Sequence, residues 1–132
     1  MHVGYTVAEF DAARSAVKNA FNYAGWDGEG ALPVGDETRV NAIGALNHFE
    51  NLTSAPEVTP NPNGTLSLEW ETHQGFGLLE IGRTRFSLYL QPSNGTPVMT
   101  SGGVDDISPA LGRFVDVVLY PKPSHSLTLT SR

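Results

Sequence analysis

The chain has 132 residues, no cysteine and a formal net charge of −6. A chain of this length can bury one hydrophobic core, so we predict a single domain over residues 1–132. The lack of cysteine excludes disulfides, thiolate nucleophiles and cysteine-ligated metals. Direct binding to nucleic acid is not expected, because it requires Lys and Arg gathered on one face. In residues 1–60, acids outnumber bases by eight to three.

The N-terminal sequence predicts a cytoplasmic protein with no membrane partner. It lacks the basic segment and the continuous apolar core of a signal peptide, and no apolar run approaches the length needed to span a bilayer. No sequence motif indicates a cofactor or a metal, and we predict neither.

Two helices are predicted in the N-terminal part of the chain. The first has a capping box at Thr6 and Glu9, followed by apolar residues at spacings of three and four, and should end at Gly25. The second should be capped by Gly35 or Asp36 and should end near residue 51. Its predicted core positions recur at a spacing of three, at Val40, Ile43, Leu46 and Phe49, and are supported by Ala42 and Ala45.

From residue 63 the apolar residues recur at every second position, which predicts strands instead of helices. Turn sequences at 63–64, 73–75, 83–85 and 94–95 divide this part into an antiparallel meander of four to five strands, with a short strand at 57–59. Ser108 and Pro109 should start a third helix, whose predicted apolar stripe is Ile107, Leu111, Phe114, Val115 and Val118. A last short strand through Leu127 and Leu129 is weakly indicated. We therefore predict an α+β domain whose helices pack on one face of the sheet.

Two acids and one aromatic residue should lie on the other, solvated face of that sheet. Glu69 and Glu71 alternate with buried residues of one strand, and Tyr89 alternates with those of another. We predict that all three bind a partner. An alternative is that Glu69, Glu71 and His73 form a small-ligand site or a hydrolytic site, because hydrolysis by paired carboxylates uses similar separations.

The stretch "WDGEGALP", residues 26–33, joins the first two predicted helices. Trp26 should close the core. The acids Asp27, Glu29, Asp36 and Glu37 lie in or just after this stretch with no base among them, so they are further candidates for binding a basic partner.

Residues 26–71 resemble an uncharacterised family of small bacterial and phage-encoded proteins. The resemblance rests on the W-D-G-x-G loop and on a P-x-P-x-G turn that leads into a strand ending in Glu-Trp, here Glu69 and Trp70. It implies a similar placement of these motifs and implies no activity.

Taken together, these features predict a non-enzymatic protein-interaction module. The expected role is that of a small phage or mobile-element inhibitor, similar to anti-CRISPR proteins or antitoxins, which acts on a larger basic partner. That partner could itself bind nucleic acid. Self-association as a homodimer stays open at this point.

Overall fold

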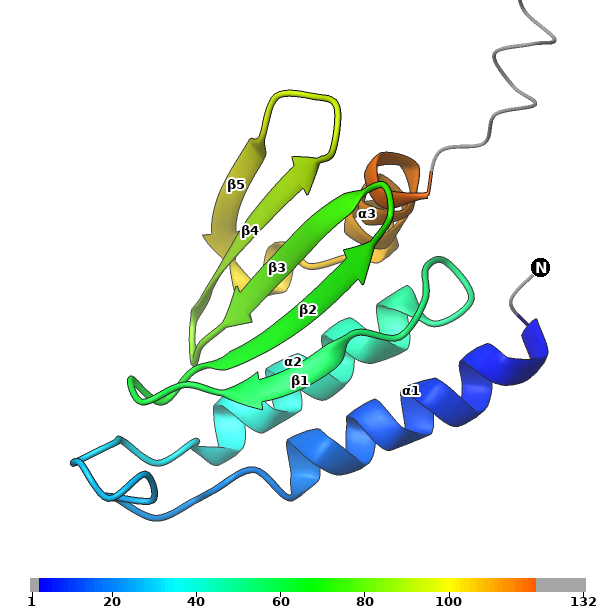
Figure 1. The fold of residues 1–132 in the computed structure, drawn as a ribbon. Helices are drawn as coiled ribbons and strands as arrows, with labels where there is room; N and C mark the ends of the chain where they lie inside the picture. The colour runs from blue at the N-terminus through cyan, green and yellow to red at the C-terminus, as the bar shows by residue number, and fades with distance from the viewer. Residues whose placement is uncertain (1–2, 121–132) are drawn as a thin grey trace, which may run out of the picture.

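The protein, in a computed structural model that describes residues 3–120, consists of an antiparallel sheet with helices on one side (Figure 1). The predicted α+β class is confirmed. In chain order the elements are α1 (Val3–Lys18), α2 (Asp36–Phe49), β1 (Glu57–Pro60), β2 (Leu66–Thr72), β3 (Gly75–Ile81), β4 (Arg85–Pro92), β5 (Val98–Gly103), the 3-10 turn η1 (Val104–Asp106) and α3 (Pro109–Leu119). The strand suggested at 127–129 lies outside the described residues.

The sheet is a meander with the strand order β1-β2-β3-β4-β5, and every neighbouring pair is antiparallel. The predicted turns are at the expected places. Gly64, with φ 91°, occupies the left-handed region in the turn between β1 and β2, where the Gly64 N–H donates to the Asn61 carbonyl over 2.9 Å. Such a φ strongly favours glycine, which explains the Asn-Gly pair in the sequence.

The core lies between the sheet and the helices. Alternation in β2 points Leu66, Leu68 and Trp70 toward the helices, and all three are buried. The indole N–H of Trp70 donates to the Ser54 carbonyl over 2.8 Å, so its polar atom is satisfied inside the protein. In Figure 1, α2 lies behind β1 and β2, so the opposite face of the sheet is turned toward the viewer.

The predicted bounds of the first helix are wrong at both ends. α1 begins at Val3 rather than at Thr6, and it ends at Lys18, seven residues before Gly25. The guanidinium of Arg39, on α2, donates to the carbonyls of Val17 and Lys18 at the end of α1. A cation at this end also interacts favourably with the helix dipole. The end of α1 is therefore stabilised by a residue from the next helix.

Some predicted core positions of α2 and α3 are also wrong. Val40 is 69% exposed, because the buried stripe of α2 is rotated toward Thr38, Ala42 and Ala45. Phe114 of α3 is 38% exposed. The two helices approach closely at Gly112, where an added Cβ would lie 2.8 Å from Cδ1 of Phe49. This close approach fixes which side of α3 is buried.

Candidate functional site

In the part of the chain that the structure describes, α1, α2 and α3 leave one face of the sheet uncovered, and we call it the open face. Its residues alternate with those of the core along each strand. They are Glu57, Thr59, Ser67, Glu69, Glu71, Phe76, Leu78, Glu80, Ser87, Tyr89, Gln91, Met99 and Ser101.

A continuous row of side chains crosses the open face from one edge of the sheet to the other. The strand register places Glu57 opposite Glu69, Glu69 opposite Leu78, Leu78 opposite Tyr89, and Tyr89 opposite Met99. Leu78 and Tyr89 are half-buried, whereas Met99 is 76% exposed. The row is therefore acidic on β1 and β2 and apolar on β3 to β5.

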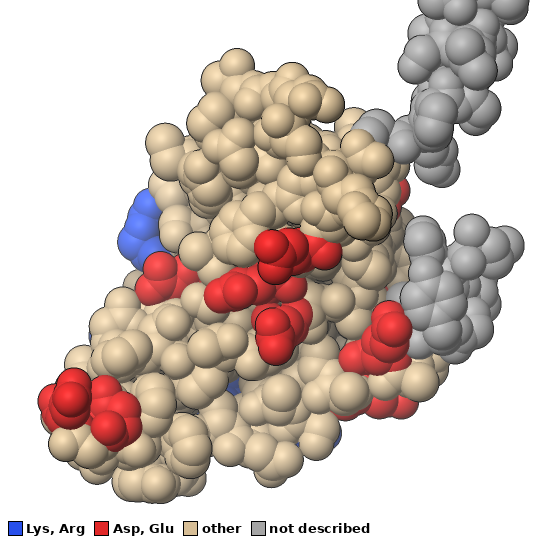
Figure 2. Space-filling model, viewed as in Figure 1, with Lys and Arg blue, Asp and Glu red and all other residues tan. Residues whose placement is uncertain are grey.

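The acidic end of the row contains two carboxylates on directly paired residues, Glu57 and Glu69, and Glu71 follows two positions along β2. Figure 2 looks onto the open face and shows acidic side chains gathered over β1 to β3. Like charges directly opposite each other on neighbouring strands repel. The acidic end of the row therefore favours the approach of a positively charged group and disfavours that of a further negatively charged one.

A cavity of about 260 Å³ lies beside these carboxylates. Its lining includes Glu57, Glu69 and Glu71, together with Ser54 and Tyr120, whose hydroxyls are hydrogen-bonded to each other. The alternative site required His73 as the third member beside Glu69 and Glu71. His73 lies instead in the turn after β2 and does not line this cavity. In residues 3–120, no three acidic or histidine side chains are grouped so that they could hold a metal ion.

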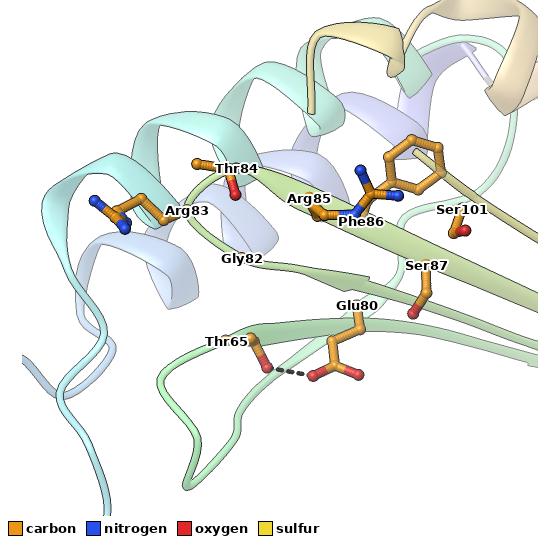
Figure 3. Close-up of a pocket in the computed structure, with 9 residues that line it drawn as sticks. All are labelled: Thr65, Glu80, Gly82, Arg83, Thr84, Arg85, Phe86, Ser87 and Ser101. Atoms are coloured by element: carbon orange, nitrogen blue, oxygen red, sulfur yellow. Dashed lines mark hydrogen bonds between the residues drawn. The ribbon is translucent and has the colours of Figure 1, made fainter. Parts of the chain in front are cut away.

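A second hollow, of about 470 Å³, lies at the β3–β4 turn (Figure 3). Its polar lining combines the Glu80 carboxylate, the Arg85 guanidinium and several hydroxyl groups. Glu80 accepts a hydrogen bond of 2.7 Å from the Thr65 hydroxyl. Arg83 points away from Glu80 in Figure 3. This hollow therefore adds a negatively charged carboxylate and a positively charged guanidinium to one end of the open face.

The loop between α1 and α2 carries an aromatic cluster outside the core, so the predicted role of Trp26 as a core residue is wrong. The Trp26 ring stacks on Phe21, with the ring centroids 5.0 Å apart and the planes 18° apart, and Tyr23 meets Phe21 edge-on. The indole N–H of Trp26 donates to the Leu32 carbonyl over 2.8 Å. Because α1 ends at Lys18, Phe21 does not continue its apolar stripe and is 42% exposed.

The four loop acids singled out from the sequence have different surroundings. Asp27 accepts hydrogen bonds from the backbone N–H groups of Glu29 and Ala31, over 2.8 and 3.0 Å. These bonds hold the pKa of Asp27 below its ordinary value of 3.8. Asp36 and Glu37 lie in the first turn of α2, where negative charge is favourable.

The predicted partner-binding residues therefore fall into two separate places. Glu69, Glu71 and Tyr89 share the open face. Asp27 and Glu29 lie in the loop between α1 and α2, and Asp36 and Glu37 lie at the start of α2. Sequence reasoning missed Glu57, Leu78 and Met99. A two-residue turn at 63–64 would pair residue 57 with residue 70, whereas the longer observed turn pairs it with Glu69, so the sequence did not indicate this contact. The apolar members of the row required the register of all five strands.

Comparison of the chain with protein-family models, with curated proteins and with solved structures finds no match. Within residues 3–120, no helix combines the length and the apolar character needed to span a bilayer.

Proposed function

We propose that this protein is a non-enzymatic interaction module that binds a basic partner protein through the open face. The observation that carries the proposal is the row from Glu57 to Met99, in which an acidic end and an apolar end are continuous across five strands. Interfaces commonly combine a desolvated apolar or aromatic centre with charged groups that orient the partner.

The two ends of the row would contribute in different ways. Burial of Leu78, Tyr89 and Met99 against a partner would remove apolar surface from water, which favours association. The facing carboxylates of Glu57 and Glu69 repel each other in the free protein, and a Lys or Arg placed between them would relieve that repulsion. Charge complementarity is therefore the reason to expect a basic partner.

The proposal includes the finer role of a small phage or mobile-element inhibitor. A domain of 132 residues with a net charge of −6 is large enough to cover a basic surface on a larger protein. If that basic surface normally binds nucleic acid, this domain would compete with the nucleic acid for the same surface. Release of nucleic acid from the purified partner on addition of this protein tests the inhibitory role.

Charge reversal on two separate surfaces tests where the partner binds. The variant Glu69→Lys/Glu71→Lys changes the open face, and Glu29→Lys/Asp36→Lys makes the same change of charge in the loop between α1 and α2 and at the first residue of α2. Partner proteins are captured from cells that naturally express the chain, and the affinity of each variant is then measured by calorimetry with the purified partner. We expect the sheet pair of substitutions to weaken binding at least tenfold and the loop pair to leave it nearly unchanged. The reverse result would move the site to the loop.

Photo-crosslinking provides a second, geometric test. A photoreactive residue at Met99 should crosslink to the partner, whereas one at Val40 on α2 should not. Both positions are exposed to a similar extent, 76% and 69%, so accessibility alone predicts equal crosslinking. Equal yields at the two positions would contradict the proposal.

A further inference from the structure

The two edges of the sheet differ in how they are protected against further strand pairing. Natural proteins block edge strands with charges, prolines, short length or a covering element. β1 has only four residues, with Glu57 at its start and Pro60 at its end, and α1 packs against it. β5 has six residues, VMTSGG, with neither a charge nor a proline.

The lack of charge extends well beyond β5. No Asp, Glu, Lys, Arg or His occurs from Phe86 to Val104, although the whole chain has 22 acidic and basic residues. β5 also extends past the helical layer: Thr100 pairs with buried Leu88 but is itself exposed. In Figure 1, β5 is the outermost strand and no described element lies along its outer side.

The hydrogen-bond pattern shows which backbone groups of β5 face outward. The Val104 N–H donates to the Thr84 carbonyl over 2.9 Å, in line with the β4–β5 register. In an antiparallel pair, residues alternate between those that bond to the neighbouring strand and those that direct their N–H and C=O away from it. Counting back from Val104, the outward set is Gly103, Ser101 and Met99.

We propose that the outer edge of β5 pairs with β5 of a second copy of this chain. In the antiparallel register that uses all three outward residues, Ser101 lies opposite Ser101 of the second copy, and Met99 lies opposite Gly103. The pairing joins two sheets into one of ten strands and makes the open faces continuous. Because β1 is protected, this assembly is a closed dimer with twofold symmetry.

A second copy fits this edge because the contact is self-complementary. Each outward N–H meets an outward carbonyl, and the bulky side chain of Met99 meets a residue without a side chain. Although each copy carries a net charge of −6, no two charged side chains oppose each other along the paired strands. The inference goes beyond the proposed function, since it concerns the strand edge and does not depend on a basic partner.

Opposite charges at the symmetry axis test both the dimer and its register. Wild type should sediment as a dimer in analytical ultracentrifugation of the full chain. Ser101→Lys and Ser101→Glu should each raise the dimer dissociation constant about tenfold, because like charges then face each other. An equimolar mixture of the two variants should again form dimers. Ser87→Lys, on β4 of the same face, is the matched control and should leave the dimer unchanged.

A proline substitution removes hydrogen bonds between the two copies without adding charge. Ser101→Pro deletes an N–H that faces away from β4, so the strand can stay in the sheet. It should weaken the dimer roughly ten- to a hundredfold, through the loss of two symmetry-related hydrogen bonds. Circular dichroism checks that each variant is folded. A monomeric wild type, an undiminished Ser101→Pro dimer, or a mixture of the charged variants that stays monomeric would each overturn the proposal.

Discussion

Arg39 provides the sharpest test of how α1 and α2 are held together. Its guanidinium donates to four backbone carbonyls: those of Val17 over 2.8 Å, Lys18 over 3.2 Å, Ala20 over 2.6 Å and Val34 over 3.0 Å. These carbonyls come from the end of α1 and from both ends of the following loop. Arg39→Ala leaves all four without this donor.

The expected cost follows from the number and the exposure of these bonds. A hydrogen bond to a charged group contributes about 1.5–3 kcal/mol, but four bonds that share one group are not additive, and water can replace some of them because the site is only partly buried. We expect Arg39→Ala to lower the free energy of unfolding by about 2–4 kcal/mol. Arg39→Lys should lie between this variant and wild type, because one ammonium cannot reproduce the planar fork.

Urea unfolding monitored by tryptophan fluorescence measures this effect, with Trp70 in the core and Trp26 in the loop as the reporters. Replacing either tryptophan by Phe separates their signals, so that loosening of the loop can be distinguished from global unfolding. Arg83→Ala is the control. Nη1 of Arg83 lies 3.9 Å from Oε1 of Glu37 and both side chains are 72% exposed, so this ion pair should contribute little to stability. If Arg39→Ala unfolds at the same urea concentration as Arg83→Ala, the reasoning is refuted.

Three further variants test other features of the structure. Within residues 3–120, the buried Thr53 hydroxyl has no hydrogen-bond partner, so Thr53→Val should raise the free energy of unfolding by about 1 kcal/mol in urea unfolding, and a loss of stability would contradict this. Gly75 has φ 154°, and an added Cβ would lie 2.3 Å from the Gln91 carbonyl oxygen, so Gly75→Ala should cost about 2–4 kcal/mol in thermal unfolding. Asp27 has a lowered pKa in the folded state, so its carboxylate stabilises the fold at neutral pH and this contribution is lost as pH falls through that pKa. Asp27→Asn should therefore be less stable than wild type at neutral pH and converge with it in acid; a difference independent of pH would contradict this assignment.

The sheet could be predicted from the sequence because its signals are local. Alternation in "TLSLEWET" and the Asn-Gly turn before it were sufficient to place β2 and to separate its two faces. The end of α1 could not be predicted in this way. It depends on Arg39, which is 21 residues from Lys18 in the sequence and acts only once α2 is packed beside α1.

The candidate site was predictable to a similar degree. Alternation alone placed Glu69, Glu71 and Tyr89 on the solvated face. The row that links them depends on the relative register of five strands, and no single strand contains that information. The position of Trp26 could not be predicted, because it depends on where α1 ends. The wrong boundary of the first helix therefore led to the wrong prediction that the indole lies in the core.

The consecutive order of the strands has a consequence for how the chain reaches its folded state. Every pair of neighbouring strands is also adjacent in sequence, so each pairing closes only a short loop. Folding rates rise as the sequence separation of native contacts falls, and a meander is the sheet topology that keeps this separation small. The hairpins of β2, β3 and β4 can therefore form early. α1, which packs against α2 and β1, must bring together segments that are much farther apart in the chain, and we expect it to dock late.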